Sequence, residues 1–150
     1  MSKKLKEVLE NVLSMPYFKN DHAQGGEKFS RHEDAVAERL KGGGFNEIPA
    51  SNFPKLSKNV LKKWADGGDE TALRNAIAGM KEGEFISQPG GSQAFPDFLV
   101  MDFEGGKLYA VECKSTKKGV APMWNDNLPK PNGIYVFSSG SLNKTTVFLG

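Results

Sequence analysis

Three charged residues in the second half of the chain could do chemistry together. The stretch AFPDFLVMDFEGGKLYAVECKSTKKG contains two apolar runs joined by EGG, with Asp97 before the first run and Glu112 and Lys114 at the end of the second. Side chains alternate along a strand, so Glu112 and Lys114 point to the same face. A hairpin through EGG brings Asp97 beside Glu112, because the two residues flank the turn almost symmetrically. The sequence therefore predicts one carboxylate-rich cluster at one end of two apolar strands.

Two carboxylates and an ammonium in this arrangement suit the hydrolysis of a phosphodiester bond. Neighbouring carboxylates repel each other unless a cation neutralises them, and Mg²⁺ prefers carboxylates, carbonyl oxygens and water as ligands. A bound metal ion activates water and clamps the phosphate, while the ammonium of Lys114 stabilises the developing negative charge. The alternative interpretation is structural: Asp97 caps a turn, and Glu112 and Lys114 form a surface ion pair.

The order Pro96-Asp97, a gap of fourteen residues and then Glu112-Cys113-Lys114 resembles the PD-(D/E)-x-K nuclease superfamily. The surrounding sequence is most similar to type II restriction endonucleases. The resemblance implies that Asp97 and Glu112 bind Mg²⁺, with Mn²⁺ as a substitute. It also implies that the backbone carbonyl of Cys113 is a further ligand and that Lys114 assists the attacking water. Double-stranded DNA is then the substrate, and a homodimer is expected because such enzymes cut both strands.

The superfamily core has the element order αβββαβ, often with a glutamate on the first helix that faces the site. In the predicted helix over residues 27–41, Glu33 matches this role because it falls on the apolar stripe, where an acid needs a partner or a metal. His32, Asp34 and Glu38 lie on the same helix, so an ordinary solvated charge run is the alternative. The two histidines, His22 and His32, are too few for a zinc site, and we expect both at the surface.

Polar residues on both sides of the charged cluster are candidates for DNA contacts, since lysines bind phosphate and amides read base edges. For each of them the alternative is an ordinary solvated loop. The candidates are Ser87, Gln88, Ser92, Gln93, Lys117, Lys118 and Asn125. The long crossover helix of the superfamily is not evident after Lys114, which leaves the topology of the last strands open. A repair, recombination or phage-processing nuclease and a non-catalytic DNA-binding module of the same fold remain the alternative functions.

The elements that must hold these residues change character at Glu84. Before it, apolar residues at helical spacing predict helices, the last two of them within a helical insertion over residues 45–82. After it, five short runs rich in β-branched and aromatic residues predict strands. The fold prediction is α+β or α/β, a restriction-endonuclease-like core with a mixed sheet of about five strands flanked by helices. The predicted helices span residues 4–15, 27–41, 56–65 and 69–80, and the sheet spans 84–150.

The composition places limits on the class of protein. With 150 residues, 38% of them hydrophobic and 25% charged, the chain is predicted to form a single domain with a real core. A net charge of +2 gives only weak support for a nucleic-acid partner. The single cysteine fits a cytoplasmic protein, and no apolar stretch is long enough for a membrane span. The sequence ends at VFLG without a closing helix, which favours a truncated C-terminus or a partner that covers the last strand.

Overall fold

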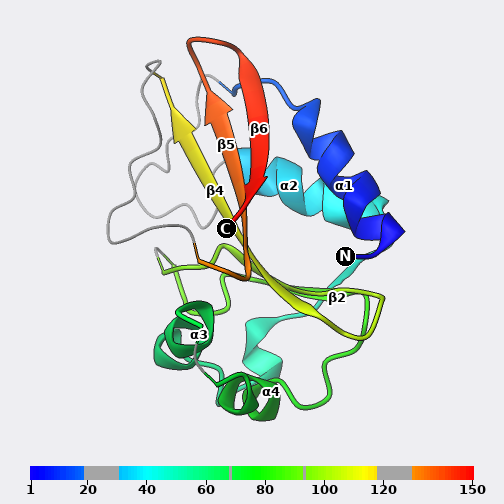
Figure 1. Ribbon diagram of the computed structural model, residues 1–150, viewed down its shortest axis with the longest axis vertical. Helices are drawn as coiled ribbons and strands as arrows, with labels where there is room; N and C mark the ends of the chain where they lie inside the picture. The colour runs from blue at the N-terminus through cyan, green and yellow to red at the C-terminus, as the bar shows by residue number, and fades with distance from the viewer. Residues whose placement is uncertain (19–30, 68, 93, 118–129) are drawn as a thin grey trace.

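The computed structural model describes residues 1–18, 31–67, 69–92, 94–117 and 130–150. Within these residues, four α-helices pack against one six-stranded mixed sheet, so the architecture is α+β (Figure 1). The helices are α1 (Lys3–Leu13), α2 (Arg31–Gly42), α3 (Lys58–Ala65) and α4 (Thr71–Ala76), with a short 3₁₀ helix at Ala50–Asn52. The strands are β1 (Asn46–Glu47), β2 (Glu84–Ser87), β3 (Phe98–Met101), β4 (Leu108–Thr116), β5 (Gly133–Ser139) and β6 (Lys144–Leu149).

The predicted elements agree closely with those observed in the described part of the chain. Each of the four predicted helices and five predicted strands is present. The predicted start of the second helix, residues 27–30, lies outside the described residues, and α2 is described from Arg31. Strand β1 was not predicted, because it has only two residues and its pairing with β2 is a long-range contact.

The strands follow one another across the sheet in sequence order, from β1 at one edge to β6 at the other. Strands β2, β3 and β4 form an antiparallel meander, β5 runs parallel to β4, and β6 is antiparallel to β5. Most of the connection between β4 and β5 lies outside the described residues. Strand β4 is the longest. It pairs with β3 from Leu108 to Val111, and beyond that point its pairing continues with β5 alone.

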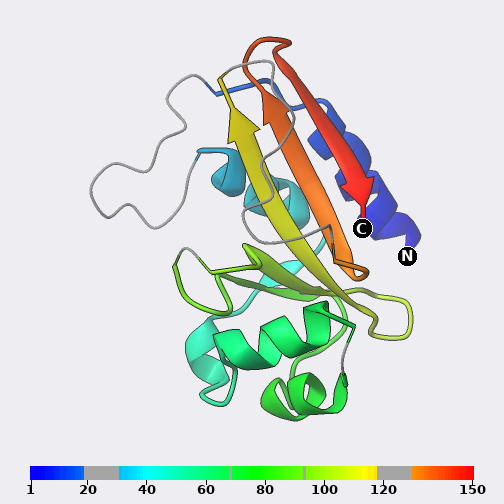
Figure 2. The same ribbon diagram turned by 60° about the vertical axis from the view of Figure 1, so that its left-hand side comes forward.

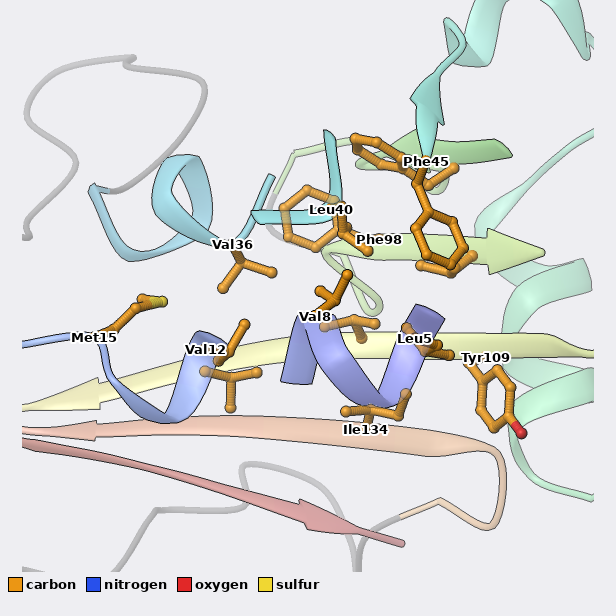
Figure 3. Packing of buried hydrophobic residues seen from close by; sticks show 14 residues of the cluster. Leu5, Val8, Val12, Met15, Val36, Leu40, Phe45, Phe98, Tyr109 and Ile134 are labelled. Carbon is orange, nitrogen blue, oxygen red and sulfur yellow. The ribbon is translucent and has the colours of Figure 1, made fainter. Parts of the chain in front are cut away.

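Two hydrophobic clusters occupy the two faces of the sheet, because successive strand residues point to opposite sides. Phe98 and Val100 of β3 face one cluster together with α1 and α2. Leu99 and Met101 face the other cluster, which is closed by α3 and α4. Figure 3 shows the first cluster, where side chains of α1 and α2 converge on the sheet. The sheet is therefore the middle layer between two pairs of helices.

The start of α1 is tied to the turn between β3 and β4. The Ser2 hydroxyl accepts the Leu5 N–H at 3.1 Å and caps the helix. The backbone N–H of Ser2 donates to Asp102 Oδ2 at 2.6 Å, and the Ser2 hydroxyl donates to the other oxygen of that buried carboxylate. These bonds fix α1 against the hairpin that carries the charged cluster. Among the described residues, no helix combines the length and the apolar character that crossing a lipid bilayer requires.

Candidate active site

The β3–β4 hairpin brings Asp97 and Glu112 together. Its strands pair Phe98 with Val111 and Met101 with Leu108, and continuing this register by one residue places Asp97 opposite Glu112. The Asp97 Oδ2 atom accepts the backbone N–H of Cys113 at 2.7 Å. The hairpin pairing predicted from the sequence is therefore confirmed.

The turn of this hairpin depends on two adjacent glycines. The N–H of Asp102 donates to the Lys107 carbonyl at 2.8 Å and closes the turn. Gly105 and Gly106 both have positive φ angles, 70° and 62°, in the left-handed region that residues with a Cβ rarely adopt. The EGG sequence thus supplies the backbone conformation that sets the register of Asp97.

Glu112 and Lys114 lie on the same face of β4 and form an ion pair. Leu108 and Ala110, which precede them on that face, pack in the cluster closed by α3 and α4. The Lys114 Nζ atom lies 2.9 Å from Glu112 Oε1, and the two side chains are 31% and 12% exposed. Because the Glu112 side chain is largely buried, this pair is less screened by solvent than an ordinary surface pair.

Burial destabilises the charged forms of both carboxylates, and the charge of Glu112 adds to this effect at Asp97. Burial, together with the negative charges of Glu112 and Glu33, raises the pKa of Asp97 from its ordinary 3.8 to about 8, although the Cys113 N–H and Lys114 oppose the shift. Burial also raises the pKa of Glu112, against the effect of Lys114 and of a hydrogen bond from the Asp97 backbone. Without a further cation, the two carboxylates therefore share a proton near neutral pH.

Lys114 keeps its charge in this setting. Burial alone would lower its pKa, but Glu112 and other nearby groups together more than offset that effect and the pKa is raised above 10.5. Asp97 and Tyr135 act in the same direction. At neutral pH the side chain is therefore an ammonium, which donates hydrogen bonds and cannot accept a proton.

One oxygen of the site lacks a partner. In the described part of the chain, Glu112 Oε2 is buried and has no hydrogen bond. A buried carboxylate oxygen without a partner is costly, and a cation would satisfy it. The described residues contain no group of three or more His, Cys, Asp or Glu side chains that could hold a metal ion. A cation at this point would therefore rely on Asp97, Glu112 and backbone carbonyls, which suits Mg²⁺ because this ion keeps several of its water ligands.

Glu33 lies on α2, which packs against the opposite face of the sheet from Glu112. It is half-buried and its charge raises the pKa of Asp97, but among the described residues it does not form a metal-holding group with Asp97 and Glu112. The expectation that the neighbouring His32 lies at the surface was wrong, and His22 lies outside the described residues. His32 is 1% exposed, accepts the Phe18 N–H at 3.2 Å and packs its ring against Tyr17 and Phe18. The aromatic pair that follows α1 covers this histidine.

The predicted DNA contacts fall in different environments. Ser87 is half-buried, and in the described part of the chain its hydroxyl has no hydrogen-bond partner. Gln88 has a positive φ of 48°, and its N–H donates to the Asp97 carbonyl at 2.7 Å. Ser92 and Lys117 are exposed. Three further candidates lie outside the described residues: Gln93, Lys118 and Asn125.

Sequence reasoning missed Tyr135 as a residue of the site. The parallel register of β4 and β5 places Tyr135 opposite Glu112. Its hydroxyl accepts the Lys130 N–H at 2.7 Å, and its ring stacks on Phe148 at 5.4 Å between centroids. Burial raises the pKa of Tyr135, and the Glu112 charge adds to this effect. The run GIYVFSS predicted the strand, but only the register across a long connection reveals which residue faces Glu112.

Comparisons with protein-family models, with curated proteins and with solved structures find no match to this chain. What supports a function is therefore the geometry of Asp97, Glu112 and Lys114, together with the sequence pattern that these residues form.

Proposed function

We propose that this chain is a Mg²⁺-dependent endonuclease of the type II restriction enzyme kind, which hydrolyses phosphodiester bonds in double-stranded DNA. One observation carries the proposal. Asp97 and Glu112 lie on paired strands and both have a raised pKa, that of Asp97 partly because of the Glu112 charge, and the Lys114 ammonium lies 2.9 Å from Glu112. Such a cluster is unstable without a cation and suited to binding one.

The order of elements supports a restriction-endonuclease-like core. After α2 come β1, α3 and α4, then the meander β2–β3–β4 and then β5 parallel to β4. Apart from the elements between α2 and β2, this matches the order αβββ…β that the sequence resemblance implies. The segment in which the crossover helix of the superfamily would lie includes residues 118–129, which are outside the described residues.

Asp97 and Glu112, with the backbone carbonyl of Cys113, are the groups that would hold Mg²⁺. When bound, Mg²⁺ lowers the pKa of a water molecule and stabilises negative charge on the phosphate. The hydrogen bond from the Cys113 N–H fixes one oxygen of Asp97, so its other oxygen can face the ion. Glu33 adds negative charge from the α2 side, which strengthens the attraction for a cation.

Lys114 acts as a hydrogen-bond donor. Its raised pKa keeps it protonated, so it orients the attacking water or binds a phosphate oxygen and does not serve as the general base. As charge develops on the phosphate, the ammonium stabilises it from a fixed position beside Glu112. A homodimer would place one such site on each DNA strand.

The test uses plasmid DNA with Mg²⁺ and four proteins: wild type, Glu112→Ala, Lys114→Ala and the control Glu104→Gln. Glu104 is an exposed acid in the β3–β4 turn, so its replacement changes charge outside the site. We expect cleavage by wild type and control, and losses of about 10²–10³-fold or more in the two site variants. Equal activity in all four proteins, or no activity with either Mg²⁺ or Mn²⁺, contradicts the proposal.

The second candidate is a non-catalytic DNA-binding module of the same fold. The direct ion pair between Lys114 and Glu112 favours it, because this pair partly neutralises one carboxylate without a metal. In that case the protein binds DNA but cuts none, and Mg²⁺ does not change its thermal stability. If the protein does cut, discrete fragments indicate a restriction enzyme, whereas a smear indicates a repair, recombination or phage-processing nuclease.

A further inference from the structure

A concentrated positive charge lies on α3 and the turn before it. Residues 49–65 contain four lysines and no acid, in a chain whose total net charge is only +2. All four lysines are exposed, and within the described residues none of them forms an ion pair. We call these residues the α3 lysines: Lys55, Lys58, Lys62 and Lys63.

Helix stability does not explain this charge. Lys58 is the first residue of α3 after the Ser57 cap, and no acid lies in the first turn. A cation there opposes the helix dipole. Lys58 and Lys62 are also four residues apart on the same helix, where like charges repel. Lys62 and Lys63 occupy the favourable last turn, so the dipole accounts for only part of the set.

The α3 helix lies on the same face of the sheet as the catalytic cluster. Its buried side chains Leu61 and Trp64 share a hydrophobic cluster with Ala110, which precedes Glu112 on that face of β4. Figure 2 shows α3 beside the lower part of the sheet, with the strands of the site rising away from it. Helix α3 therefore packs on the side of the sheet to which Glu112 points.

Contacts at both ends connect α3 to the site. At its start, the Cα of Lys58 lies 3.5 Å from the position that a Cβ on Gly90 would occupy, in the loop that leads to Asp97. At its end, Asp66 pairs with the Lys130 ammonium, and the Lys130 N–H donates to the Tyr135 hydroxyl. These contacts place the two ends of α3 beside the loop before Asp97 and beside Tyr135.

We propose that the α3 lysines form a binding surface for the phosphate backbone of double-stranded DNA, away from the bond that is cut. This inference rests on the proposed nuclease function, because it extends the DNA-binding surface of the same site. A duplex is the ligand that fits, since its phosphates carry the charge that complements four exposed lysines that form no ion pair within the described residues, close to a site for phosphodiester chemistry. Such contacts position the duplex and carry no sequence preference.

The test measures binding of a fluorescent 20-base-pair duplex by anisotropy, with Ca²⁺ in place of Mg²⁺ to prevent cleavage. The variant is Lys58→Gln with Lys62→Gln. The matched control is Lys3→Gln with Lys6→Gln, two exposed lysines of α1 on the opposite face of the sheet. We expect the α3 variant to bind roughly 10- to 60-fold more weakly at 0.1 M salt, with the slope of log K against log salt reduced by about 1.8. The control pair should bind as wild type does.

Thermal melting shows whether the variants are folded. The replaced lysines are exposed, and removing two like charges four residues apart should leave the melting temperature equal or slightly higher. Affinity and salt slope equal to wild type in a folded α3 variant overturn the proposal. An equal loss of binding to a labelled polyglutamate of the same charge assigns the surface to an acidic protein and also overturns it.

The two proposals fail in different ways. If the wild type binds DNA through the α3 lysines but never cuts it, the proposed binding surface is supported and the proposed nuclease function is contradicted. If the wild type cuts DNA and the α3 variant binds DNA as well as wild type, the proposed nuclease function is supported and the proposed binding surface is contradicted.

Discussion

Replacing Asp97 with asparagine should stabilise the metal-free protein at alkaline pH. The pKa of Asp97 is about 8 in the folded chain and 3.8 ordinarily, so the folded state holds this proton more tightly than the unfolded state. The stability of the wild type therefore falls as pH rises from about 4 to about 8, and the loss is complete above that range. Asp97→Asn removes the titrating group and keeps an oxygen that can accept the Cys113 N–H.

The size of the expected gain in stability follows from the pKa shift of Asp97. A difference of about four pKa units corresponds to an upper limit of about 6 kcal/mol, at 1.36 kcal/mol per unit. Glu112 shares the proton with Asp97, and Lys114 partly offsets the charge of the pair, so we expect a gain of about 2–4 kcal/mol at pH 9. Near pH 4 the variant and the wild type should have the same stability.

The assay is urea unfolding in EDTA at pH 5, 7 and 9, with the exposed-site variant Glu104→Gln as the charge control. The difference in the free energy of unfolding between Asp97→Asn and wild type should increase with pH. The free energy of unfolding of Glu104→Gln should change with pH as that of the wild type does. Mg²⁺ at ten times its dissociation constant should then stabilise the wild type by about 1.4 kcal/mol and leave Asp97→Asn unchanged. If Asp97→Asn is less stable than wild type at pH 9, or keeps the same pH dependence, the two carboxylates do not repel each other as inferred.

Two further predictions concern the surroundings of the site. Tyr135→Phe keeps the stacked ring but leaves the Lys130 N–H without its acceptor, so it should lower the free energy of unfolding by about 1–2 kcal/mol and reduce the cleavage rate with little change in KM. Gly83→Ala should destabilise the protein by at least about 2 kcal/mol more than Gly105→Ala, measured by urea unfolding. Both glycines have positive φ, but a Cβ at Gly83 collides with the Phe103 ring, whereas one at Gly105 meets open space.

The hairpin at the centre of the site could be predicted because its signals are local. Continuous apolar runs rich in β-branched and aromatic residues mark β3 and the first half of β4, and the EGG turn joins them with the glycines that its φ angles require. These two signals together set the register, and the register places Asp97 beside Glu112. The helices were predictable for the same reason, since their apolar spacing repeats within one segment.

The parts that could not be predicted depend on contacts distant in the sequence. Tyr135 enters the site only through the parallel register of β5 with β4, across a long connection. His32 is buried because Phe18 and Tyr17, which follow α1, cover it. The α3 lysines were visible as charges, but the sequence does not show that their helix lies on the same sheet face as Glu112. In each case the sequence gives the residue and its local element, but its neighbours depend on tertiary packing.

Strand β4 is longer than the strands that pair with it, and this affects how the two ends of the sheet can move relative to each other. Strand β3 pairs with the first part of β4 and β5 with the rest, so β4 joins two leaves of the sheet, β1–β3 and β5–β6. Asp97 belongs to the first leaf, while Glu112 and Lys114 lie just past the join on the second. Any torsion between the leaves passes through β4 at Val111 and changes the gap between the two carboxylates. A ligand that binds both leaves would therefore change the distance between the carboxylates of Asp97 and Glu112.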